Sequence, residues 1–90
     1  MIKLLNASYC GDYTIFCEFS DGMSGEYDLQ HLLMSNETPL TRVLRDLTEF
    51  KRFFLSSGAL CWPIGLELDP DAIYMELESK GKLMPTRLAA

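Results

Sequence analysis

The ten residues from Trp62 to Asp71 constrain the fold of this chain more than any other segment. A tryptophan leads into a Pro-x-Gly turn, a short alternating run follows, and Asp69-Pro70 then predicts the start of a helix. Asp is a good N-cap, and proline is favoured at the first helical position. Gly65 is expected to supply the positive φ that such a turn needs. The segment therefore fixes geometry, but none of its residues is an obvious catalyst.

The first third of the chain predicts three antiparallel strands. Residues 2–9 are apolar and extended in character, residues 13–19 alternate between two faces, and residues 23–29 read as a return strand. Gly11-Asp12 and Asp21-Gly22 are the turn signals between them. One face of the middle strand is expected to carry Tyr13, Ile15, Cys17 and Phe19, and the other Thr14, Phe16 and Glu18.

Short helices are expected next. Residues 29–34 predict a helical turn, and Thr38-Pro39 predicts the start of a helix, with Thr38 as N-cap. Thr48 is expected to cap a second short helix. Residues at helical spacing are predicted to face inward, namely Leu40, Val43, Leu44 and Leu47, and the residues between them outward, namely Thr41, Arg42, Arg45 and Asp46.

A second hairpin is expected from residues 53–56 and 59–62, joined by Ser57-Gly58. A last helix begins after Asp69, carries the apolar pair Ile73 and Leu77, and ends near Gly81. The predicted class is α+β, a small mainly antiparallel sheet made of the meander and the second hairpin, with short helices on one face. Strands grouped before helices argue against a parallel doubly wound sheet.

The length of 90 residues fits one domain, expected over residues 1–81. Residues 82–90 contain Pro85 and little that could be buried, so a loose tail is expected there. The three cysteines show no paired spacing, which predicts free thiols rather than a disulfide framework. The sequence shows no secretory signal and no apolar run near the ~20 residues of a membrane span. A cytoplasmic protein is the resulting expectation.

The formal net charge of −5 argues against nucleic-acid binding through the overall field of the chain, because phosphate contacts need clustered Lys and Arg. A nucleic-acid site would require Arg42, Arg45, Lys51 and Arg52 to converge on one face. A solvated helix face is the simpler interpretation, since Asp46 and Glu49 are interspersed among them.

Few residues offer catalytic chemistry. His31 is the only histidine, and a contact with Asp28 would be needed for base catalysis, but an exposed histidine on a short helical turn is favoured. Cys10 stands beside Asp12, whose charge opposes thiolate formation, so an inert thiol is favoured. Neither residue predicts a catalytic site, and no cofactor is expected.

Acidic residues gather toward the C-terminal third, at Glu67, Asp69, Asp71, Glu76 and Glu78. Hard cations such as Ca²⁺ take about six or more oxygens, and the spacing here is not that of an EF-hand loop. A helix cap and a solvated face explain most of the cluster, so no metal site is predicted.

Trp62 has two interpretations. A core role at the end of an apolar strand is favoured, while tryptophan is also enriched in interface hot spots. The predicted interaction surface comprises Trp62, Pro63, Gly65, Glu67 and Asp69.

Several motifs together resemble a known family. They are Phe19-Ser20-Asp21-Gly22, Asp28-Leu29, Phe50 after a short helical segment, and the run Trp62 to Leu68. In this order they are similar to a small bacterial family catalogued as domain of unknown function 2442. The resemblance implies a compact α+β domain, and no enzymatic activity comes with it. It also implies, for some relatives, a following helix-turn-helix domain or a neighbouring short gene, as in a toxin–antitoxin-like pair. Glu67 stands where the family often has Asp.

The sequence thus predicts a non-enzymatic protein-interaction module whose partner is another small protein or a second copy of itself. The alternative is a dimeric nucleic-acid-associated transcriptional regulator. Residues 2–9 form a long apolar strand with Lys3 as its only charge, and edge strands of small sheets are often covered by a partner copy. A two-fold homodimer is therefore expected, through either that edge or the exposed apolar face of a helix.

Overall fold

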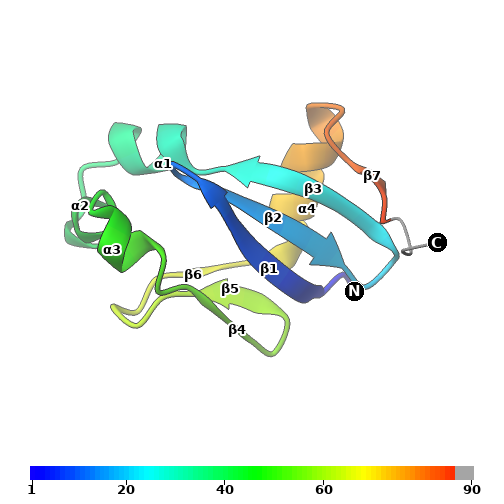
Figure 1. The fold of residues 1–90 in the computed structure, drawn as a ribbon, viewed down its shortest axis with the longest axis horizontal. Helices are drawn as coiled ribbons and strands as arrows, with labels where there is room; N and C mark the ends of the chain where they lie inside the picture. The colour runs from blue at the N-terminus through cyan, green and yellow to red at the C-terminus, as the bar shows by residue number, and fades with distance from the viewer. Residues whose placement is uncertain (87–90) are drawn as a thin grey trace.

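The computed structural model describes residues 1–86 and has the predicted α+β architecture (Figure 1). Two antiparallel sheets are present, of strand order β1-β2-β3-β7 and β4-β5-β6. The strands are β1 Leu4–Gly11, β2 Thr14–Phe19, β3 Met23–Asp28, β4 Phe54–Ser56, β5 Ala59–Cys61, β6 Glu67–Leu68 and β7 Met84–Pro85. The helices are α1 Gln30–Ser35, α2 Pro39–Leu44, α3 Leu47–Phe50 and α4 Pro70–Ser79.

The first sheet is the predicted meander. Ile15, Cys17 and Phe19 of β2 are each at most 1% exposed, as the alternating pattern predicts. The helix α4 lies behind this sheet, and its buried Ile73 and Leu77 belong to the same core cluster (Figure 1). The helices α1, α2 and α3 gather instead at the end of the sheet where β3 finishes (Figure 1). Within residues 1–86, no helix or strand covers the face of β1–β3 that points away from α4 (Figure 1).

The second sheet contains the predicted hairpin and one strand that the sequence did not predict. Strands β4 and β5 pair antiparallel around Ser57-Gly58, whose φ values of 51° and 83° are both in the left-handed region. The unpredicted strand is β6, which pairs with β5. The two sheets are joined at one corner, because the Leu4 amide donates to the Gly58 carbonyl at 2.9 Å.

The helix starts are capped as predicted in two cases out of three. Thr38 forms a capping box with Thr41, and Asp69 caps α4 by accepting from the Asp71 amide. The prediction that Thr48 caps α3 is wrong, since the Asp46 carboxylate accepts from the Thr48 amide at 3.0 Å.

The predicted inward stripe after Pro39 is also wrong at two positions. Thr41 is buried at 6% exposure, and Val43 is 39% exposed. The cause is that the helix α2 ends at Leu44, so a stripe drawn through Leu47 crosses a break between two helices. Thr41 turns inward because its hydroxyl donates to the Asn36 carbonyl and accepts from the Thr38 amide.

The expectation of a loose tail from residue 82 is wrong for its first half. Met84 and Pro85 form β7, which pairs with Ser24 and Met23, and the Thr86 amide donates to the Gly22 carbonyl at 2.7 Å. The remainder of the predicted tail, residues 87–90, lies outside the described residues.

Candidate interaction site

The Pro-x-Gly turn is closed by two backbone hydrogen bonds. The Gly65 amide donates to the Trp62 carbonyl, and the Trp62 amide donates to the Leu66 carbonyl, both at 2.9 Å. Gly65 has φ of 106°, and a Cβ added there would have open space around it. Glycine is therefore required by the backbone conformation and not by crowding, as the sequence predicted.

Trp62 lies inside the protein, at 2% exposure. Its indole Nε1 donates to the Phe50 carbonyl at 2.8 Å, and its ring lies against those of Phe50 and Phe53 at centroid distances of 5.9 and 6.4 Å. The favoured core interpretation of Trp62 is confirmed. Its place in the predicted interaction surface is wrong, because a buried indole that bonds inward cannot meet a partner.

The other four residues of the predicted surface lie together on the outside. From Pro63 to Asp69 the odd-numbered residues are exposed. The residues between them, Ile64, Leu66 and Leu68, are partly buried and pack against the core. We call Pro63, Gly65, Glu67 and Asp69 the β6 ridge. It follows an edge of the second sheet, since β6 is the last strand in the order β4-β5-β6.

One end of the β6 ridge borders an open depression of about 510 Å³, which we call the acidic notch. Its lining residues are Met1, Ile2, Lys3, Ser57, Ala59, Glu67, Asp69, Pro70 and Asp71. The Ile2 amide donates to Asp71 Oδ1 at 3.1 Å, which ties the N-terminal residues to the first turn of α4. The acidic notch thus brings the N-terminus together with three of the five residues of the predicted acidic cluster. These three residues are 60 or more positions away from Met1 in the sequence.

Glu76 and Glu78, the other members of the predicted acidic cluster, do not line the acidic notch. Glu76 pairs with Lys80 on the same helix at 3.2 Å. Within residues 1–86, no group of three His, Cys, Asp or Glu side chains is placed to hold a metal ion. Nor is any described helix long and apolar enough to cross a membrane.

The basic residues that a nucleic-acid site would need have internal partners. Arg42 and Arg45 both pair with Glu37, at 3.0 and 2.9 Å, and Arg52 pairs with Glu49. The hydrogen bonds from Arg45 and Arg42 hold the pKa of the Glu37 carboxyl below its usual range. Lys51 lies over the Tyr9 ring, with its Nζ 4.8 Å from the centroid.

The catalytic candidates are likewise not assembled. His31 is exposed, and its Nδ1 lies 3.3 Å from the Ser35 hydroxyl. Asp28 lines the same small depression of about 170 Å³, but its Oδ1 accepts from the Gln30 amide instead. The Cys10 thiol is exposed and contacts the Ser8 carbonyl. Cys17 and Cys61 are buried free thiols, and burial raises the pKa of Cys17 to about 12.

The comparison with protein families gives one match. The family described as Protein of unknown function (DUF2442) matches residues 5–79, which is most of the chain. No curated protein and no solved structure matches. The chain therefore belongs to this family, as the motifs indicated, and the match assigns it no activity.

Proposed function

We propose that this protein is a non-enzymatic interaction module that binds a second small protein along the β6 ridge. The proposal rests on one observation: a series of exposed residues directly follows a buried tryptophan that holds their backbone in place. Pro63, Gly65, Glu67 and Asp69 face outward at a sheet edge, while Trp62 fixes their backbone from inside. Edge strands leave backbone groups free for a partner, and a rigid edge loses little entropy on binding.

The surroundings of His31 and Cys10 support binding over catalysis. Among residues 1–86, the hydrogen-bond partner of His31 is a serine hydroxyl four residues away, and Cys10 has no cation beside it in the described contacts to stabilise a thiolate. The alternative function, a nucleic-acid-associated regulator, is not favoured, because Arg42, Arg45 and Arg52 are held by carboxylates of the same chain.

A homodimer along β1 stays a prediction. Strand β1 is an edge of the first sheet, but its register shifts between Leu4 and Asn6 and again between Tyr9 and Gly11. The Leu4 amide is already bonded to Gly58. Bulges shorten the regular edge that a second copy could extend, so a different protein is the partner that we test first.

The test is co-purification with the product of the adjacent gene, the partner expected of a toxin–antitoxin-like pair. The intact chain should retain that protein at a fixed stoichiometry. Glu67→Lys should abolish retention, and the matched control Glu78→Lys, at an exposed position of α4, should not. Equal retention by both variants, with both folded by circular dichroism, would show that the β6 ridge is not the binding surface.

A further inference from the structure

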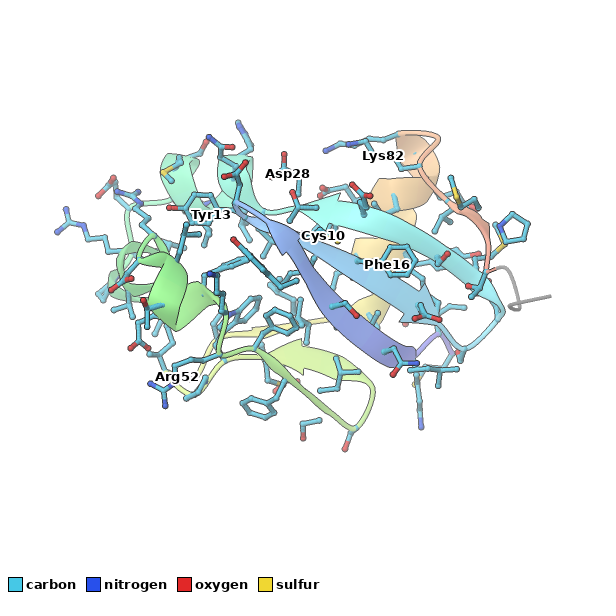
Figure 2. All side chains as sticks on the ribbon, in the orientation of Figure 1. Cys10, Tyr13, Phe16, Asp28, Arg52 and Lys82 are labelled. Carbon is cyan, nitrogen blue, oxygen red and sulfur yellow. The ribbon has the colours of Figure 1, made fainter. Side chains whose placement is uncertain are left out.

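The face of β1–β3 opposite α4 carries an aromatic side chain among carboxylates. Phe16 is partly exposed and stands on the side of the sheet away from α4 (Figures 1 and 2). Cross-strand register places Ser8 and Glu26 directly opposite Phe16 on its two sides. Glu18 and Asp28 lie on the same face, opposite Ser24 and Thr14. Opposed residues on an antiparallel sheet are ~5 Å apart and diagonal ones ~7–8 Å, so Glu26 stands beside Phe16 and Asp28 lies diagonally from it. Glu18 follows two residues along the same strand.

These carboxylates have no cationic partner within the described chain. The four ion pairs among residues 1–86 use Glu37, Glu49 and Glu76. Glu18 and Glu26 are not members of any of them. A depression of about 360 Å³ opens beside the ring, and its lining residues are Phe16, Gly25, Glu26, Gly81, Lys82 and Met84. Lys82 is the only base in that lining.

We infer that this face, the Phe16 face (Phe16, Glu18, Glu26 and Asp28), docks an arginine-containing basic segment of a partner protein. A guanidinium stacks on an aromatic ring and pairs with carboxylates at the same time, which a lysine ammonium does less well. The inference rests on the proposed function, that the chain binds a partner protein, and names the chemistry of a second contact surface on it.

A second copy of this chain does not fit the Phe16 face. Stacking two such faces would bring six carboxylates together, and like charges in contact are repulsive. The arginines at positions 42, 45 and 52 of a second copy are already paired with its own carboxylates. Among the described residues 1–86, charge complementarity therefore favours a basic partner of different sequence over a second copy.

The first experiment titrates a fluorescein-labelled peptide of alternating arginine and threonine with the full chain and follows anisotropy. The double variant Glu18→Gln with Glu26→Gln is compared with Asp46→Asn with Glu78→Gln, two exposed residues outside both proposed surfaces. Each pair removes two negative charges from the net −5, and Asn keeps the helix cap. We expect the Phe16-face pair to weaken binding about tenfold, equivalent to about 1.4 kcal/mol, and the control pair less than about twofold. Equal weakening of binding by the two double variants would overturn the inference, because the peptide would then respond only to the net charge of the chain.

The second experiment isolates the ring. Phe16→Leu keeps an apolar side chain of similar bulk but removes the aromatic face, so binding of the arginine peptide should fall about two- to fivefold. A peptide with lysine in place of arginine should lose less affinity when Phe16 is replaced by Leu. Amide shifts on adding the arginine peptide should be confined to β2 and β3. Shifts centred on β6 instead would overturn the inference.

The failure of this inference can be told apart from the failure of the proposed function. If the neighbouring gene product is retained equally by the intact chain and by the Glu18/Glu26 double variant, the Phe16 face is not its docking surface and the proposed function stands. If that protein is not retained at all, the proposed function fails, and the peptide titration still decides whether the face binds arginine.

Discussion

The two faces of strand β2 differ in what determines their residues. Ile15, Cys17 and Phe19 are at most 1% exposed and lie in the core shared with α4. Phe16 and Glu18 alternate with them and face away from α4, where no element of the described residues 1–86 covers the sheet (Figure 1). Packing accounts for every residue of the first face. It does not account for an aromatic ring on the second, and a residue that folding does not require is the better candidate for binding.

The same contrast occurs in the second sheet. Trp62 is buried and bonded inward, while its neighbour Pro63 begins the exposed β6 ridge. Each candidate surface is thus backed by an element of the core. Substitutions on the buried side of each element should lower stability, and substitutions on its exposed side should weaken binding.

The largest effect is expected at Trp62. Trp62→Ala removes a buried ring and leaves the Phe50 carbonyl without its donor, so it should lower the free energy of unfolding by about 3–5 kcal/mol. Pro63→Ala, one residue along but exposed, should cost less than about 1 kcal/mol. Urea denaturation followed by circular dichroism measures both. An unchanged midpoint for Trp62→Ala would mean that the indole is not part of the core.

A similar pair tests the two faces of β2 directly. Phe19→Ala removes a side chain at 1% exposure that packs edge-to-face on Tyr74 at 5.1 Å, and should cost about 3–4 kcal/mol. Phe16→Ala should cost less than about 1 kcal/mol, because its ring is already partly in water. Comparable losses from the two variants would show that the Phe16 face contributes to folding as well.

Local patterns predicted much of this fold, but not its long-range contacts. The alternation in residues 13–19 and the turn residues gave the meander and the second hairpin. The strands β6 and β7 have two residues each, which is too few for a period to be visible. Thr41 and Val43 were misplaced because the apolar stripe was drawn from Leu40 through Leu47, across the break that the Asp46 cap marks between α2 and α3.

The candidate site shows the same division. The exposed row of the β6 ridge was predictable from the Pro-x-Gly turn and the alternation that follows it. The burial of Trp62 depends on a carbonyl twelve residues earlier, and the acidic notch depends on a bond between Ile2 and Asp71, 69 residues apart. Contacts of this separation leave no local trace in one sequence.

The reactivity of two cysteine thiols tests the difference between the exposed and buried faces of the first sheet without any substitution. Cys10 is exposed, whereas Cys17 is buried and burial raises its pKa to about 12. Cys10 should react with a disulfide reagent at once at mildly alkaline pH, and Cys17 at least about a hundredfold more slowly, because it reacts only when the sheet opens. All three cysteines should react in denaturant. Fast reaction of Cys17 in native protein would contradict the closed packing of β2 against α4.

The smallest effect is expected at the surface ion pairs of Glu37. Its folded-state pKa is lowered by the hydrogen bonds from Arg45 and then Arg42, so any stability it contributes is present above the unfolded pKa. That stability is lost as the pH falls through the folded pKa.

Glu37→Gln should therefore lower Tm slightly at neutral pH and leave it unchanged in strong acid, where both proteins carry a neutral side chain. The effect should be small because the carboxylate is in water. Glu26→Gln is the matched control, since Glu26 belongs to no ion pair in residues 1–86 and its substitution should leave Tm at neutral pH nearly unchanged. If Glu37→Gln matches the unaltered protein at every pH, the arginines gain nothing from Glu37 in solution. They would then be free cations, and the argument against a nucleic-acid partner would lose its structural support.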